Sequence, residues 1–293
     1  MRIAVYSRLL KPQDIPYVQA VFDNLKHWNT DVYVHSEYIS EIRKKITYSE
    51  EIRTFDSCET LKSEAVELLI ALGGDGTILD TLSLIMDSNI PIAGVNLGRL
   101  GFLSSIDKNS IAEAIKALVQ GNYQLDKRTV LSMDSNLPIF NGLTYALNDC
   151  TISKRDTSSM IVVHTYVNGE FLNSYWADGL IISTPTGSTG YSLSCGGPII
   201  FPNSGNFVIT PIAPHNLTMR PMVIPDDAVL SFEIEGRGEY FLCTLDSRYE
   251  AITQSHRFAV KKADFTINIA RLFEQNFLST LREKLGWGID SRN

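Results

Sequence analysis

The amino-acid sequence predicts an α/β domain followed by an all-β sandwich domain and a C-terminal helix. In the first third of the chain, short apolar runs alternate with segments whose apolar residues recur at helical spacing, as in a parallel, Rossmann-like sheet with crossover helices. From about residue 123, short β-branched and aromatic runs are separated by turn residues. We therefore expect domains at 1–122 and 123–269, followed at 270–293 by a helix whose apolar stripe must pack on another surface, for which the first domain is one candidate.

The elements of the first domain follow from the same two periods. Apolar runs predict strands at 3–6, 32–34, 66–72 and 90–95, and helical spacing predicts helices at 15–25, 39–46, 78–86 and 111–118. The run VELLIAL at 66–72 indicates a strand that is buried on both faces. Ser110 is expected to cap the last of these helices and Gly121 to close it.

Two turn signals shape the prediction for the second domain. Asn168-Gly169 separates MIVVHTYV from EFLNSYW, and both residues tolerate the positive φ of a two-residue hairpin turn. Gly236-Arg237-Gly238 separates VLSFEIE from EYFLCTL in the same way, so we expect a second hairpin there. Near the end of the chain, apolar residues at helical spacing predict a helix from Arg271 to Gly286.

Composition narrows the class of protein. Hydrophobic residues make up 44% of the chain and charged residues 20%, which favours a folded globular protein over a disordered one. A net charge of −7 argues against a broad electrostatic surface for nucleic acid or an anionic membrane. The four cysteines form no C-x-x-C pair, and no apolar run approaches the roughly 18 residues of a membrane span. With no signal-peptide pattern at the start, we expect a soluble, cytoplasmic protein.

The sharpest motif is Gly73-Gly74-Asp75-Gly76-Thr77, between a predicted buried strand and a predicted helix. Ligands bind at such junctions of open α/β sheets, and glycines beside a helix N-terminus suit a phosphate. Asp75 would repel phosphates unless it binds a metal that carries them or takes a proton from a hydroxyl nucleophile. The alternative is a plain glycine-rich turn with Asp75 as a helix cap. A P-loop is excluded because the chain contains no Gly-Lys-Ser or Gly-Lys-Thr, and the G-x-G-x-x-G fingerprint is excluded because its third glycine is missing.

A second, longer motif runs from Asp178 to Pro198 and concentrates hydroxyls and glycines after an apolar strand. Such a loop offers many hydrogen bonds to a polar ligand, and Tyr191 could stack on a base; a Ser/Thr-rich sheet loop is the alternative. A serine-hydrolase elbow is excluded because the final glycine of G-x-S-x-G is missing. Taken alone, Asn148-Asp149 is a turn pair and His215 a packed loop histidine.

Together these segments resemble the NAD kinase family. The shared GGDGT pentapeptide also occurs in diacylglycerol, sphingosine and phosphofructo-kinase relatives, and the long second motif is what selects NAD kinase. The segments similar to family motifs are 73–77, 96–103 (NLGRLGFL), Asn148-Asp149, 178–198, 211–215, Arg220-Pro221 and 281–287.

The resemblance implies ATP-dependent phosphorylation of the adenosine ribose 2′-hydroxyl of NAD, giving NADP, with a divalent metal cation, Mg²⁺ in the first instance. It implies that Asp75 is the acid/base group, and that the protein is a homodimer or homotetramer. The metal ligands stay open. The implied substrate-binding residues are Gly76, Asn148, Asp149, Asp178, Ser188, Thr189, Gly190, Tyr191, Ser194 and His215. Candidates for contact with ATP phosphates are Gly74, Thr77 and Arg248.

Three departures from the family pattern bear on these assignments. Asp149 stands where the family has Glu, Gly190 where alanine is common, and Asp246-Ser247-Arg248 where Asp-Gly-Gln is frequent. Two rival functions are a non-catalytic NAD(H)-binding sensor and a lipid kinase of the GGDGT group. The sequence leaves open the preference between NAD and NADH, the range of phosphoryl donors including polyphosphate, allosteric regulation and the size of the assembly.

Overall fold

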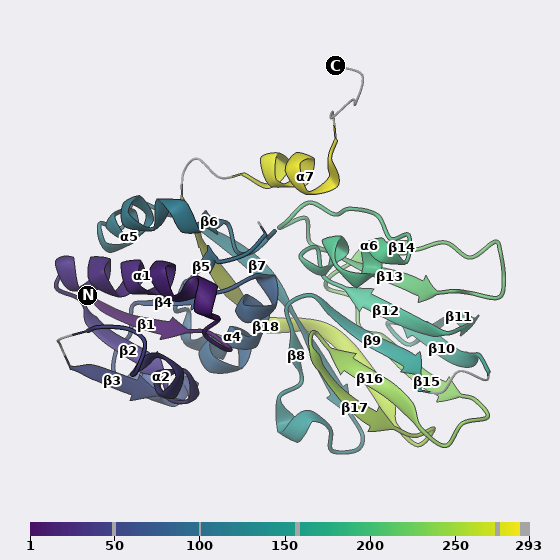
Figure 1. Cartoon of the computed structure of the whole chain (residues 1–293). Helices are drawn as coiled ribbons and strands as arrows, with labels where there is room; N and C mark the ends of the chain where they lie inside the picture. The colour runs from purple at the N-terminus through teal and green to yellow at the C-terminus, as the bar shows by residue number, and fades with distance from the viewer. Residues whose placement is uncertain (49–50, 100, 156–158, 273–275, 288–293) are drawn as a thin grey trace. The chain divides into compact units, whose positions relative to one another are not determined.

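The computed structural model describes residues 1–48, 51–99, 101–155, 159–272 and 276–287 (Figure 1). The chain divides into two compact units. The first comprises Met1–Lys127 and Ile267–Asn293, and the second comprises Arg128–Thr266. Two strands, β7 (Gln124–Ser135) and β18 (Arg257–Arg271), contribute residues to both units.

A parallel sheet with the strand order β18-β5-β4-β1-β2-β3 forms the centre of the first unit. Two of its inner strands, β4 and β5, are buried along their whole length, which the run at 66–72 had predicted for β4. The strands are β1 (Arg2–Tyr6), β2 (Asp31–His35), β3 (Ile52–Phe55), β4 (Leu68–Leu72), β5 (Ile92–Asn96) and the short β6 (Ile106–Asp107) beside β5. The helices are α1 (Ile15–His27), α2 (Ser36–Ile42), α3 (Cys58–Ser63), α4 (Asp75–Ile85), α5 (Ile111–Val119) and α7 (Phe277–Leu285).

The predicted α/β character of this unit is confirmed, with three local differences. β3 and α3 lie in a stretch for which the sequence predicted no element, because each buries too few side chains to create an apolar period. α2 ends at Ile42, four residues before the predicted end. The side chain of Ser110 makes no capping hydrogen bond at α5.

The second unit is an antiparallel β-sandwich. One sheet has the order β14-β13-β12-β9-β16-β17; the other contains β11-β10-β15-β18, with β7 beside β18 and β8. Alternate residues of both sheets, such as Ile152, Leu180, Val163 and Phe232, share one hydrophobic core. The remaining strands are β8 (Tyr145–Ala146), β9 (Asp149–Lys154), β10 (Ile161–Val167), β11 (Glu170–Ala177), β12 (Gly179–Ser183), β13 (Asn206–Ile212), β14 (Met222–Pro225), β15 (Leu230–Glu235), β16 (Phe241–Leu245) and β17 (Arg248–Ile252), with one short helix, α6 (Tyr191–Ser194).

One predicted hairpin is confirmed and the other is wrong. Asn168 and Gly169, with φ of 51° and 84°, form the turn between the paired strands β10 and β11. The segment Gly236–Gly238 joins no hairpin, because β15 pairs with β10 and β18 while β16 pairs with β9 and β17. The chain instead crosses from one sheet to the other, and a local turn signal does not reveal which strand becomes the neighbour.

The C-terminal helix begins later than predicted. β18 continues to Arg271, and α7 begins at Phe277, where the side chain of the capping residue Asn276 accepts a hydrogen bond from the Ser279 amide at 2.8 Å. Phe273, which was expected in this helix, and residues 288–293 lie outside the described residues. The Phe277 ring lies 6.1 Å from that of Phe102, so the helix contacts the first unit. None of the helices in the described ranges combines the length and apolar character required to cross a membrane.

Candidate functional site

Three backbone amides hold the carboxylate of Asp75. This residue begins α4 immediately after the buried strand β4, at the carboxyl edge of the parallel sheet. Its Oδ2 accepts a hydrogen bond from the Phe102 amide at 2.8 Å. Its Oδ1 accepts from the amides of Leu103 and Ser104 at 3.0 and 2.9 Å. The two motifs that the sequence analysis singled out in the first unit, 73–77 and 96–103, therefore meet at one side chain; Leu100 lies outside the described residues.

Glycine is required where these two motifs touch. A Cβ on Gly101 would lie 1.8 Å from Oδ1 of Asp75, far inside van der Waals contact. Gly73 has a φ of 152°, and a Cβ there would lie 2.2 Å from Oγ1 of Thr77. The Asp75 carboxylate can therefore lie against the backbone of residues 101–104 only because position 101 carries no side chain.

A buried arginine supports the segment that holds Asp75. Arg271, which is 7% exposed at the end of β18, donates from Nη2 to the carbonyl oxygen of Phe102 at 2.8 Å. Its Nε donates to Oδ2 of Asp126 at 2.6 Å, so the guanidinium is neutralised by a carboxylate of the same unit. Phe102 is thus held at its carbonyl by Arg271 while its amide binds Asp75. Sequence analysis had placed Arg271 in a helix and did not identify it.

A cavity of about 260 Å³ opens against the GGDGT loop in the first unit. Gly73, Gly74 and Thr77 form one wall at the N-terminus of α4, a position that favours a bound anion. The cations on its lining are Arg8, Lys11 and Arg99, all exposed; Asp14 is an anion on the same lining. Arg8 is paired with Asp80 and also donates to the Gly76 carbonyl.

In the second unit, Asn148 immediately precedes β9 and Asp149 begins it, and three backbone amides there point at one carboxylate. Asp246, in the turn between β16 and β17, accepts from the amides of Leu147, Asn148 and Asp149 at 2.8, 2.7 and 3.2 Å. Asp149 itself is only 7% exposed, and its Oδ1 accepts a hydrogen bond from the Thr151 hydroxyl at 3.1 Å. Burial and the nearby charge of Asp246 raise the pKa of Asp149 to about 7.

The glycine- and threonine-rich motif packs on the same backbone. Thr184 donates from its hydroxyl to the Leu147 carbonyl at 2.6 Å and from its amide to the Asn148 carbonyl at 2.9 Å. A Cβ on Gly187 would lie 2.1 Å from the Asn148 carbonyl oxygen, so this contact requires glycine. The structure therefore brings Asn148, Asp149 and the 184–190 loop together.

The other predicted residues of this unit differ in how accessible they are. Tyr191 and Ser194 are exposed on α6, and Thr189 and Gly190 are half-buried. Ser188 is fully buried, and its hydroxyl donates to the Pro185 carbonyl at 2.7 Å and accepts from the Ile200 amide at 3.0 Å. That hydroxyl therefore stabilises the loop itself.

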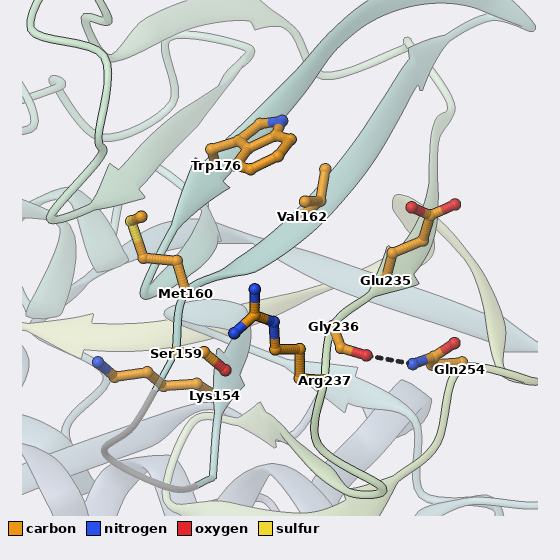
Figure 2. Close-up of a pocket in the computed structure, with 9 residues that line it drawn as sticks. All are labelled: Lys154, Ser159, Met160, Val162, Trp176, Glu235, Gly236, Arg237 and Gln254. Atoms are coloured by element: carbon orange, nitrogen blue, oxygen red, sulfur yellow. Dashed lines mark hydrogen bonds between the residues drawn. The ribbon is translucent and has the colours of Figure 1, made fainter.

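Asp178 and His215 lie near a larger cavity of about 780 Å³ (Figure 2). Oδ1 of Asp178 is paired with Nζ of Lys154, a lining residue, at 2.6 Å. His215 is exposed, and its amide donates to the carbonyl of Trp176. Trp176 lies beside Val162, its partner on the neighbouring strand, and both line the cavity (Figure 2). The lining residues are Lys154, Ser159, Met160, Val162, Trp176, Glu235, Gly236, Arg237 and Gln254.

Arg248, predicted as a phosphate contact, donates to the backbone carbonyls of Leu143 and Tyr145. Its guanidinium also lies 5.7 Å from the centre of the Phe140 ring. These contacts stabilise the connection between β7 and β9, a structural role that the sequence did not indicate. The described residues contain no group of three or more His, Cys, Asp or Glu side chains that could hold a metal ion by themselves.

Comparison with known proteins decides the family. Models of the ATP-NAD kinase N-terminal and C-terminal domains match residues 4–123 and 147–272. Curated NAD kinases of Cytophaga hutchinsonii, Flavobacterium johnsoniae and Bacteroides fragilis are 45%, 42% and 37% identical to this chain, each over the full length of both chains. The chain belongs to the NAD kinase family.

Two solved structures share its fold. A yeast NADH kinase complexed with NADH superposes with a TM-score of 0.88 at 22% identity, covering 99% of this chain and 88% of the yeast chain. An NAD kinase from Archaeoglobus fulgidus in complex with ATP superposes with a TM-score of 0.72 at 24% identity, covering 98% of both chains. The α/β unit followed by a β-rich unit and a final helix is thus a fold found in NAD kinases.

Sequence analysis missed the cationic side of the cavity in this NAD kinase family member. Arg8 and Lys11 follow β1, and Arg99 follows β5, so all three lie at the carboxyl edge of the parallel sheet. That position was a usable signal, because ligands bind at this edge in open α/β sheets. Asp126 offered no comparable signal, since its partner Arg271 is 145 residues away in the chain.

Proposed function

We propose that this protein transfers the terminal phosphoryl group of ATP to the 2′-hydroxyl of the adenosine ribose of NAD, giving NADP and ADP. The new bond joins the ribose oxygen to phosphorus, the bond between that phosphorus and the bridging oxygen of ADP breaks, and the hydroxyl proton leaves to a base. The observation that carries the proposal is identity of 37–45% to curated NAD kinases along the whole chain.

Asp75 is the base in this proposal. A carboxylate offers about four acceptor positions, and three of them are taken by the amides of Phe102, Leu103 and Ser104. Because Oδ1 accepts two of these bonds and Oδ2 only one, Oδ2 keeps a position for the ribose hydroxyl. The amides also prevent rotation of the carboxylate, which favours proton transfer from a hydroxyl held in one place.

The phosphates of ATP occupy the 260 Å³ cavity at the GGDGT loop. Three observations support this assignment: the amides at the start of α4, the exposed cations Lys11 and Arg99, and the glycines that let phosphate approach the backbone. Gly74, Gly76 and Thr77 belong to the loop itself. Arg248 is held by carbonyls of the second unit, and we keep it as a secondary candidate for phosphate.

The dinucleotide is bound by residues of the second unit. Asn148 and Asp149 contact the adenosine or its ribose. Thr189 and Gly190 line the dinucleotide pocket, and Gly190 lies beside the Asn148 side chain. The other residues proposed to line the dinucleotide pocket are Asp178, Ser188, Tyr191, Ser194 and His215, with Ser188 acting through the loop that its hydroxyl stabilises.

A divalent cation, Mg²⁺, accompanies the nucleotide. Mg²⁺ takes oxygen ligands and is commonly bound through one or two carboxylates together with substrate phosphates. The lining of the phosphate cavity offers one carboxylate, Asp14, and the described residues contain no group of three His, Cys, Asp or Glu side chains that could hold the ion, so phosphate oxygens would supply further ligands. When bound, the ion neutralises charge on the transferring phosphoryl group.

Family membership also underlies our proposal that the protein is a homodimer or homotetramer and lies in the cytoplasm. Light scattering tests the assembly, and cell fractionation tests the location.

A coupled assay tests the reaction. Purified protein is mixed with NAD, ATP and Mg²⁺, NADP is read through an NADP-specific dehydrogenase, and NADH is run in parallel. Asp75→Asn is expected to lower kcat by roughly 10²–10⁴-fold, the usual contribution of general-base catalysis. Asp87→Asn, an exposed carboxylate of the same unit paired with Lys62, is the matched control and should retain activity. NAD binding without turnover, with any donor, would refute the proposed reaction and favour a sensor.

A further inference from the structure

We propose that Asp246 is a positioning residue that orients Asn148 and Asp149 for the dinucleotide. The proposal rests on the function proposed above, and every contact that supports it lies within the second unit. Asp246 occupies the turn between β16 and β17, which comes close to the start of β9 because Leu245 of β16 pairs with Cys150 of β9.

The Asp246 carboxylate binds three consecutive amides. Oδ2 accepts from Leu147 at 2.8 Å, and Oδ1 accepts from Asn148 at 2.7 Å and Asp149 at 3.2 Å. In return, the Asp246 amide donates to the Asp149 carbonyl at 3.0 Å. A hydrogen bond to a charged acceptor is stronger than one between neutral groups, so the Asp246 carboxylate stabilises all three amides in one arrangement.

The carbonyls of the same peptides are held from the other side. Thr184 binds the carbonyls of Leu147 and Asn148 through its hydroxyl and its amide. Each of these peptide groups is thereby bound on both edges, which prevents it from rotating. The Asn148 side chain extends from this fixed backbone, and its Nδ2 lies 3.8 Å from the point where a Cβ on Gly190, in the long motif, would lie.

The turn that carries Asp246 is built for this contact. Asp246 has a φ of 54°, a left-handed conformation that non-glycine residues rarely adopt and that costs free energy unless contacts offset it. Two residues later, Arg248 binds the carbonyls of Leu143 and Tyr145. In this one turn, Arg248 therefore binds carbonyls and Asp246 binds amides of the connection that leads into β9.

Removal of the carboxylate is expected to affect NAD more than ATP. In Asp246→Asn, an amide nitrogen replaces one acceptor oxygen and faces backbone amides, so at least one of the three donors loses its partner. We expect KM for NAD, and Kd for NAD measured by calorimetry, to rise about tenfold or more, as the loss of one or two hydrogen bonds implies. KM for ATP should stay within about twofold, because the Asp246 carboxylate binds the amides of residues 147–149 and none of these residues lines the phosphate cavity.

A matched variant separates positioning from general stability. Asn136 binds the Ser255 carbonyl and the Arg257 amide, backbone groups of a different turn in the same unit. Asn136→Ala should lower Tm as Asp246→Asn does while leaving both KM values unchanged. Asp246→Glu keeps the carboxylate one methylene further out and should restore part of the NAD affinity, which provides a second reading if Asp246→Asn folds poorly.

Three outcomes are decisive. Weakened NAD binding in Asp246→Asn, with partial recovery in Asp246→Glu and none of the effect in Asn136→Ala, supports the proposal. Unchanged NAD affinity in Asp246→Asn overturns it, as does an equal rise of KM in Asn136→Ala. If the unaltered protein forms no NADP from NAD and ATP, the proposed reaction fails instead, whereas an active protein with unaffected Asp246 variants refutes the positioning role alone.

Discussion

The buried carboxyl group of Asp149 should make the protein less stable as the pH rises through neutrality. Its pKa is raised from 3.8 to about 7, first by burial and then by the charge of Asp246. Between these two values the group is protonated in the folded protein and ionised in the unfolded chain. Unfolding then releases a proton, so the free energy of unfolding falls as pH increases, and the fall ends above pH 7.

The size of this effect follows from the pKa difference. A shift of about three units corresponds to about 4 kcal/mol of lost stability above pH 7, since one unit is about 1.4 kcal/mol. Between pH 5 and pH 8 the loss is about 2 to 3 kcal/mol, because part of the window lies below pH 5. Asp149→Asn removes the ionisable group and keeps the side-chain shape, so that variant should lack this slope.

Urea unfolding of both proteins, followed by circular dichroism at pH 5, 6, 7 and 8, measures the difference. Other titrating groups are common to the two proteins and largely cancel in the comparison. The stability of the unaltered protein relative to Asp149→Asn should fall steadily from pH 5 to pH 7 and level off by pH 8. A difference that is constant over this range would show that Asp149 ionises at its ordinary pKa and would refute the reasoning from burial.

Two further variants test the first unit. Gly101→Ala would place a Cβ 1.8 Å from Oδ1 of Asp75, so the carboxylate must move and kcat should fall about a hundredfold, towards that of Asp75→Asn. Gly238→Ala, whose Cβ would meet only an ordinary 3.5 Å contact, is the control. Full activity of Gly101→Ala in the coupled assay would contradict the role of the 101–104 backbone in holding Asp75. The double substitution Lys11→Ala with Arg99→Ala removes two exposed cations of the 260 Å³ cavity. It should raise KM for ATP about tenfold with little change in KM for NAD, as measured by varying each substrate in turn. A rise in KM for NAD alone would show that the triphosphate binds at another site.

Local sequence patterns predicted much of the fold. The alternation of apolar runs with helical spacing predicted the parallel strands β1, β2, β4 and β5 and most of their helices, because a sheet buried on both faces leaves a continuous apolar run. Weakly buried elements such as β3 and α3 produced no such run and were not predicted. Strand pairing was beyond local reasoning, as the segment 236–238 shows, because each sheet is assembled from strands far apart in the chain.

The sequence by itself determined the family, the GGDGT loop with Asp75, and the long motif at 178–198, because each is written in consecutive residues. The tertiary structure alone decided the partners of those residues. Asp75 is held by amides some 27 to 29 positions later, Phe102 by Arg271 a further 169 positions on, and Asn148 by Asp246 across 98 positions. Such contacts join single polar groups brought together by the packing of the sheets, and a lone Asp or Arg in a sequence carries no sign of the backbone group it will bind.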